Sequence, residues 1–129
     1  MNKEKKKNRI TRASANSKAR WLQNRVCELI SRLLNLPWGY EDDKLIQPRI
    51  MGQKGVDIIL RGEAYERFTF DSECKNCETW SVPAAIRQAK NNTKEGRNWL
   101  VFMKKKEFKN PVVILDAYIF FDLLKYGEK

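Results

Sequence analysis

The chain has 129 residues, enough for one domain with a single modest core. Its 26 lysines and arginines against 16 acidic residues give a formal net charge of +10, which favours a polyanionic partner such as a nucleic acid or an acidic membrane surface. The absence of histidine excludes Ser-His-Asp triads, His-Cys nucleophile pairs, imidazole zinc sites and nucleases that use a histidine base.

The positive charge is concentrated at the N-terminus. Residues 1–20 contain eight basic residues and one acid, Glu4, and carry +7 of the total. Residues 1–17 contain no aromatic residue and one branched aliphatic residue, Ile10, so they bury too little apolar surface to offset the entropy of ordering. We therefore predict a disordered basic arm over residues 1–17 and a single folded domain over residues 18–129. The arm is expected to contact nucleic acid, and a solubilising tail is the alternative.

The first half of the domain is predicted to contain one helix and three strands. A helix is expected over residues 18–36, because its apolar side chains recur on one helical face. Pro37 and Gly39 are typical of its end. Strands separated by short turns are expected over residues 45–50, 56–61 and 67–75, with turns at residues 51–55 and 62–65.

The second half is predicted to contain two helices and two strands. A helix runs from Pro83 to about Lys94, since proline is tolerated in the first turn. Two apolar strands, at residues 98–103 and 111–115, are joined by a lysine-rich loop, and a helix over residues 118–125 follows. This order predicts an α/β fold in which a mixed central sheet of about five strands is flanked by helices.

No segment is typical of a signal peptide or a membrane span, because no apolar run reaches the roughly 18 residues that a spanning helix needs. The basic arm has almost no apolar residues to insert into a membrane surface. Cys27, Cys74 and Cys77 form an odd set without secretory features, which favours reduced thiols in a cytoplasmic protein. The C-x-x-C pair fits neither four-ligand zinc nor a helix-opening redox dithiol, so Cys74 is predicted to be a small buried residue.

The strand predicted over residues 67–75 carries the residues best suited to chemistry. Its alternation places Asp71, Glu73 and Lys75 on one face. Asp57 interrupts an apolar run in the neighbouring strand, and together with Glu73 it is suited to hold a hard cation such as Mg²⁺. Lys75 is then placed to activate a water or to neutralise charge at a phosphate. The alternative is that this charged face is simply solvated.

The segments GVDIIL (residues 55–60) and DSECKN (residues 71–76) resemble the PD-(D/E)XK nuclease superfamily, with Val56 in place of the usual proline. The small size, the M-G-x-x-G turn before Asp57 and the E-C-K-N core are similar to Holliday junction resolvases of phages and archaea. The resemblance implies a restriction-endonuclease-like fold and a DNA endonuclease that uses Mg²⁺, replaceable by Mn²⁺. It also implies a homodimer that cuts paired strands of a four-way junction, and a phage protein that acts in the host cytoplasm.

The resemblance also implies roles for individual residues. It implies a metal held by Asp57, Glu73 and the backbone carbonyl of Cys74, with Lys75 as the catalytic lysine. Gln88, on the helix that starts at Pro83, matches a position that the family often fills with a polar active-site residue. A surface glutamine is the alternative there.

Members of the family often carry a further glutamate on the first helix, where this chain offers Gln23 and Glu28. On the helical wheel, Gln23 falls inside the apolar arc and Glu28 falls on the polar side. We therefore predict that Gln23 takes the glutamate position and orients a water or a phosphate without strong ligation. Glu28 is predicted to be a solvated surface residue.

Two basic groups are predicted to contact DNA phosphates, with little reading of base edges. They are Lys5, Lys6, Lys7, Arg9 and Arg12 at the N-terminus, and Lys104, Lys105 and Lys106 in the last strand connection. Trp80 is a candidate to stack on a base, with a core position as its alternative. Two other functions stay open: another DNA nuclease of the same superfamily, with a restriction or repair role, and a non-catalytic basic DNA-binding module whose carboxylates are surface charges.

Overall fold

The structure is a computed structural model that describes residues 11–50 and 52–127. Its elements in chain order are α2 (Arg12–Leu34), β1 (Ile46–Pro48), β2 (Ile58–Leu60), α3 (Gly62–Arg67), β3 (Phe70–Asn76), α4 (Val82–Asn92), β4 (Asn98–Lys104), β5 (Val112–Ile114) and α5 (Ala117–Gly127). The predicted DNA contacts Lys5, Lys6, Lys7 and Arg9 lie outside the described residues. From α4 onward, the elements closely match their predicted ranges.

The strands of the described residues form two sheets. β1 and β2 pair antiparallel, and the second sheet has the order β3-β4-β5, in which β3 and β4 are parallel and β5 is antiparallel to β4. The backbone N–H of Asp57 donates to the carbonyl of Ser72 at 3.0 Å, but the N–H of Cys74 bonds to the Asp57 side chain instead of a backbone carbonyl. The predicted mixed α/β character is confirmed. The prediction of one continuous sheet is wrong, because the Asp57 side chain takes the donor that a longer β2–β3 ladder would use.

Helix α2 begins at Arg12 rather than at Lys18, so residues 12–17, which were expected in the disordered arm, are helical. The hydroxyl of Thr11 caps the helix by accepting the N–H of Ser14 at 3.0 Å. Extending an existing helix backwards costs little per residue, so this turn forms without an apolar face of its own. The helix ends at Leu34, and the left-handed backbone of the cap residue Asn35 (φ 56°) brings the N–H of Leu36 to the carbonyl of Ser31 at 3.2 Å.

Helix α3 replaces the predicted turn at residues 62–65 and the first residues of the predicted strand. Its Ala64 is fully buried in the core. Arg67 pairs with Glu63 at 3.0 Å and donates to the carbonyl of Leu34 at the end of α2, also at 3.0 Å. Arg67 is the last residue of α3 and is bonded to the end of α2, so it is not part of the strand. The strand β3 therefore starts later than predicted, at Phe70.

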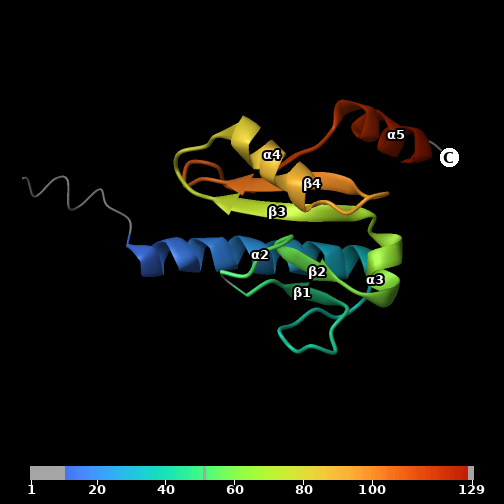
Figure 1. Ribbon diagram of the computed structural model, residues 1–129, viewed down its shortest axis with the longest axis horizontal. Helices are drawn as coiled ribbons and strands as arrows, with labels where there is room; N and C mark the ends of the chain where they lie inside the picture. The colour runs from blue at the N-terminus through green and yellow to red at the C-terminus, as the bar shows by residue number, and fades with distance from the viewer. Residues whose placement is uncertain (1–10, 51, 128–129) are drawn as a thin grey trace, which may run out of the picture.

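The helices cover the three-stranded sheet from both sides. In Figure 1, α2 runs alongside β3 with the β1–β2 pair crossing it, and α4 lies across the other side of the three-stranded sheet. One core cluster surrounds α2 and includes Cys27 and Cys74, and a second cluster, around Ala85 and Met103, lies between α4 and the sheet. The residues of β3 are therefore buried on both faces of the strand.

Helix α5 contributes little to either core. None of its residues, all of which the structure describes, is buried. Its exposed large apolar side chains are Tyr118, Phe120, Phe121, Leu123, Leu124 and Tyr126. Among the described helices, none combines the length and the apolar character that crossing a membrane would require.

Candidate active site around Asp57 and Glu73

The charged face predicted on β3 points toward α4. The alternation of Asp71, Glu73 and Lys75 is confirmed, but the interpretation of Asp71 and Glu73 as a solvated face is wrong, because both carboxylates are buried. Asp71 is fully paired: it accepts from Arg97 Nε at 2.8 Å and from the backbone N–H of Lys94 at 2.9 Å. Both oxygens of Asp71 are therefore used within the fold, and Asp71 is not a candidate to bind a ligand.

Glu73 is buried without a charged partner of its own. Its side chain is 1% exposed, and Oε1 accepts from the amide of Asn92 at 2.8 Å. Oε2 is also buried, and it has no hydrogen-bond partner among the described residues. Burial, followed by the nearby charge of Asp57, raises the pKa of Glu73 from 4.5 to about 7. A buried carboxylate with one unpartnered oxygen beside a second carboxylate is well suited to bind a cation.

Asp57 lies directly before β2 and is held by its backbone and its side chain. Its carbonyl accepts the N–H of Arg49 at 2.8 Å, and its N–H donates to Ser72. Its carboxylate accepts the N–H of Cys74 at 2.7 Å, which places it beside the neighbouring Glu73. The predicted meeting of Asp57 and Glu73 is therefore confirmed, although Asp57 precedes the strand in which it was expected.

The backbone of Cys74 fits the ligand role that the resemblance implies. In a strand, the N–H and C=O of one residue point to the same side. Because the N–H of Cys74 bonds to Asp57, its carbonyl oxygen also points toward the Asp57 side of β3. Two carboxylates and a carbonyl are oxygen donors of the kind that Mg²⁺ prefers, so the donor set fits this ion. In the described part of the chain, no group of three or more acidic or thiol side chains is gathered for a metal.

Lys75 and Gln88 complete the cluster. The positive charge of Lys75 acts on Glu73 and opposes the rise in its pKa. Gln88, exposed on α4, lines a cavity of about 560 Å³ together with Asp57, and it also lines an adjoining cavity of about 200 Å³ together with Lys75. The structure thus brings four of the predicted site residues around one face of α4.

Gln23 is 6% exposed, as its place in the apolar arc predicts. Glu28 is at the surface, where it pairs with Arg25 at 2.7 Å and Arg32 at 3.3 Å, and the hydrogen bond from Arg25 lowers its pKa. The predicted contrast between these two positions is confirmed. No hydrogen bond in residues 11–50 and 52–127 joins Gln23 to the carboxylates or to Lys75, so its role in the site stays a prediction.

The structure adds residues to the site that the sequence reasoning missed. Asn92 binds Glu73, and the larger cavity is also lined by Lys54, Arg87 and Asn91. Gln88, Asn91 and Asn92 are spaced three and four residues apart, which places them together on one helical face. This spacing is visible in the sequence, and it could have predicted that α4 has a polar face directed at the site.

The three cysteines are free thiols. Cys27 and Cys74 are buried, and burial raises the pKa of the Cys27 thiol to about 12 and that of Cys74 well above its usual range. Cys77 is exposed and its sulfur lies 3.3 Å from the carbonyl of Thr79. The prediction that Cys74 is a buried structural residue is confirmed.

The predicted DNA-contact residues differ in their surroundings. Arg12 is exposed on the first turn of α2, and Lys106 is exposed after β4. Lys104 is the last residue of β4, and Lys105 pairs with Glu107 at 3.0 Å. Comparison with models of known protein families, with curated proteins and with solved structures gave no significant match.

Proposed function

We propose that this protein is a metal-dependent, structure-specific DNA endonuclease with a restriction-endonuclease-like fold, and that it resolves four-way junctions. The observation that carries the proposal is the contact between Asp57 and Glu73, with one Glu73 oxygen buried and unpartnered among the described residues. A non-catalytic DNA-binding module gives no reason to place a second carboxylate beside the buried Glu73, because repulsion between the two is destabilising without a shared proton or a bound cation.

The chain's own residues have distinct roles in this proposal. Asp57, Glu73 and the carbonyl of Cys74 would hold Mg²⁺, which supplies positive charge to offset that of a phosphate when it is bound. Lys75 neutralises charge at the scissile phosphate or accepts a proton from the attacking water. In the hydrolysis, the water oxygen bonds to phosphorus, one P–O ester bond breaks, and the leaving oxygen takes up a proton. Gln88 and Asn92 orient the water and Glu73.

A resolvase cuts two strands related by symmetry, so it needs two active sites and is expected to be a homodimer. The exposed apolar side chains of α5 support this part of the proposal, because a surface of this kind commonly marks a protein interface. Phe120 and Phe121 on α5, with Val112 and Val113 on β5, provide the apolar anchors that a second copy would cover.

The proposal is tested with a panel of DNA substrates in Mg²⁺: an intact four-way junction, a linear duplex, a single strand and a flap. We expect wild type to make paired symmetric cuts in the junction. Asp57→Asn and Lys75→Ala should slow cleavage by roughly 100-fold or more, since each removes a group that acts at the reacting phosphate. Asp43→Asn and Lys90→Ala, which change exposed residues of the same types, serve as matched controls.

The kind of DNA that is cut distinguishes a junction resolvase from another nuclease and from a binding module. Cleavage of the linear duplex or the flap in place of the junction would identify another nuclease of the same superfamily. If no substrate is cut, and Asp57→Asn and Glu73→Gln both leave DNA binding intact, the protein is a binding module and the nuclease proposal is wrong.

A further inference from the structure

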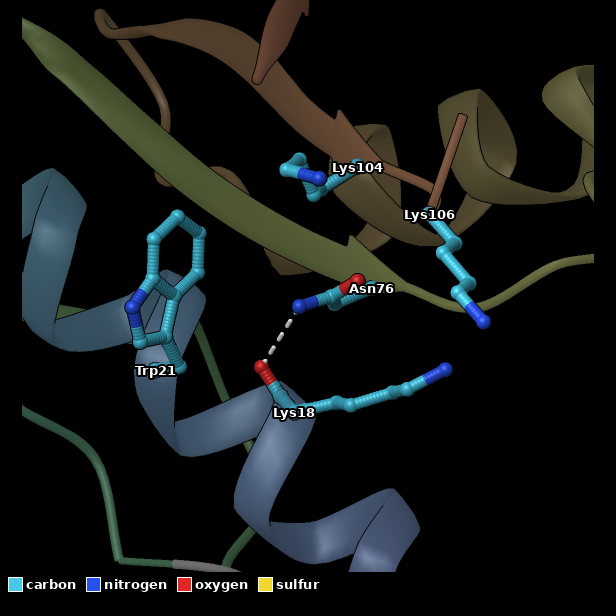
Figure 2. A pocket seen from close by; sticks show the side chains of 5 residues that line it. All are labelled: Lys18, Trp21, Asn76, Lys104 and Lys106. Carbon is cyan, nitrogen blue, oxygen red and sulfur yellow. Dashed lines mark hydrogen bonds between the residues drawn. The ribbon is translucent and has the colours of Figure 1, made fainter. Parts of the chain in front are cut away.

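A further cavity lies where the C-terminal ends of β3 and β4 meet the N-terminal half of α2. Its volume is about 420 Å³, and we call it the Trp21 pocket. It is lined by Lys18, Trp21, Asn76, Lys104 and Lys106 (Figure 2). The side-chain amide of Asn76 donates to the backbone carbonyl of Lys18 at 2.8 Å, which ties α2 to the end of β3.

The Trp21 pocket has a cationic side and an aromatic side. In Figure 2, the amino ends of Lys18 and Lys106 approach one another on one side of Asn76, and the indole of Trp21 stands on the other. Glu78 offsets part of this charge, since its carboxylate lies 3.8 Å from Lys18 Nζ and accepts the N–H of Lys106 at 2.9 Å. Three lysines against one glutamate leave the pocket cationic.

The indole of Trp21 is available to a ligand, whereas that of Trp80 is occupied by the protein. Trp80 donates to the carbonyl of Cys77 at 2.9 Å, and the ring of Phe108 packs edge-on at 5.4 Å. Lys105 lies 5.8 Å from the centre of the Trp80 ring. Trp21 is 48% exposed on α2. The aromatic residue suited to stack on a base is therefore Trp21, and the candidate Trp80 is held against the protein instead.

An aromatic ring beside several lysines suits one class of ligand. Nucleobases stack on exposed indoles, and ammonium groups bind the phosphates on either side of the base. A base inside a duplex has both of its faces covered by neighbouring base pairs, so only an unpaired base can present a face to Trp21. We infer that the Trp21 pocket binds an unpaired base of a DNA strand, with Lys18, Lys104 and Lys106 on its flanking phosphates.

The Trp21 pocket is next to the candidate active site. Asn76 follows Lys75 on β3, and consecutive strand residues point to opposite faces, so the two sites lie on the two sides of one strand end. A DNA strand that passes around this end reaches both sites within a few nucleotides. This path rests on the proposed nuclease function, whereas base binding at Trp21 does not require cleavage.

The test compares two fluorescent oligonucleotides in EDTA by anisotropy: a short oligothymidylate, and an abasic strand of equal length that keeps the sugar-phosphate chain. Trp21→Ala should weaken binding of the oligothymidylate roughly fivefold or more, and leave binding of the abasic strand unchanged. Trp21→Phe retains a ring and should keep most of the affinity. Lys18→Ala and Lys106→Ala should weaken both strands and lower the salt dependence of binding.

Leu33→Ala is the matched control, because Leu33 is an exposed apolar residue on the same helix, away from the Trp21 pocket. It should leave both affinities unchanged. Equal losses of the two strands with Trp21→Ala, no loss at all, or the same loss with Leu33→Ala would each overturn the inference.

The two proposals fail separately. If wild type cuts no DNA but the Trp21 variants still discriminate the two strands, the nuclease proposal is wrong and the Trp21 pocket stands. If Asp57→Asn abolishes cleavage but Trp21→Ala binds both strands as wild type does, only the inference about the Trp21 pocket is wrong.

Discussion

At the scale of single residues, Asp71 and Glu73 show how partners distinguish two carboxylates on one strand face. Both are buried, but Asp71 faces the guanidinium of Arg97 and Glu73 faces the neutral amide of Asn92. The alternation of the strand predicted their shared face, and this much is local. Their partners come from residues about 20 or more positions away along the chain, so the sequence pattern did not distinguish the paired carboxylate from the one that we propose as a metal ligand.

The raised pKa of Glu73 makes the stability of the metal-free protein depend on pH. Between about pH 4.5 and 7, folded Glu73 keeps a proton that the unfolded chain has lost. The free energy of unfolding therefore falls as the pH rises through this range, by on the order of 2 to 3 kcal/mol. Glu73→Gln should remove this decline, because its amide stays neutral and still accepts from Asn92. Urea denaturation in EDTA at several pH values measures the effect.

Glu66→Gln is the control for this prediction, since Glu66 is an exposed glutamate on α3. It should keep the pH dependence of wild type. Equal slopes for wild type and Glu73→Gln would contradict the prediction.

At the scale of elements, the sequence best predicted which side chains are buried where a helix has one apolar face. The periodicity of α2 predicted that Gln23 is inside and Glu28 outside. It did not predict the turn before Lys18, because that turn is stabilised by a cap at Thr11 and by propagation rather than by an apolar face. The division into two sheets was also missed, since it depends on the contact between Asp57 and Cys74 from separate segments.

Arg97, directly before β4, connects α3 with β3, and its removal should be strongly destabilising. Besides Asp71, it donates to the carbonyls of Tyr65, Phe68 and Phe70, at 2.7, 2.7 and 3.2 Å. Arg97→Met leaves Asp71 buried without its charge partner, so we expect a loss of roughly 3 to 5 kcal/mol in urea denaturation.

The double variant Asp71→Leu/Arg97→Met distinguishes the cost of an unpaired buried charge from the cost of losing the hydrogen bonds of Arg97 to backbone carbonyls. It should recover part of this loss, because no unpaired buried charge remains. Arg32→Ala, which breaks the exposed pair with Glu28, should cost less than about 1 kcal/mol. A double variant less stable than Arg97→Met would contradict the prediction.

At the scale of the whole molecule, cationic groups gather at one end of the sheet. The N-terminal half of α2 and the C-terminal ends of β3 and β4 lie at the same end in Figure 1, and Lys18 and Lys104 from these segments line one cavity. Composition predicted the excess of positive charge. It did not predict where the charge gathers, because that depends on the packing of α2 against β3.

The apolar surface of α5 lies in another part of the fold, and it leads to a prediction about assembly. We expect wild type to sediment as a dimer, and Phe121→Glu to shift it toward monomer, because a charge at a buried contact leaves an unpaired group. Phe121 is 67% exposed in the single chain, and Leu33 on α2 is 69% exposed, so Leu33→Glu is a matched control that should stay dimeric.

Circular dichroism should show that both variants keep the wild-type helix content. A wild-type monomer at tens of micromolar, or a Phe121→Glu dimer of unchanged affinity, would contradict the assignment of α5 to the dimer interface.

The hydrogen bond from Cys74 to Asp57 has a further consequence for how the chain avoids aggregation. β3 is the outer strand of the three-stranded sheet, and an outer strand with free N–H groups is a template for another chain. The carboxylate of Asp57 occupies one of these donors and blocks strand addition at that point. Asp57→Ala would therefore leave the N–H of Cys74 free to pair with another chain, besides removing a carboxylate from the candidate site. Asp57→Asn keeps an acceptor oxygen there, so it tests the chemistry without inviting self-association.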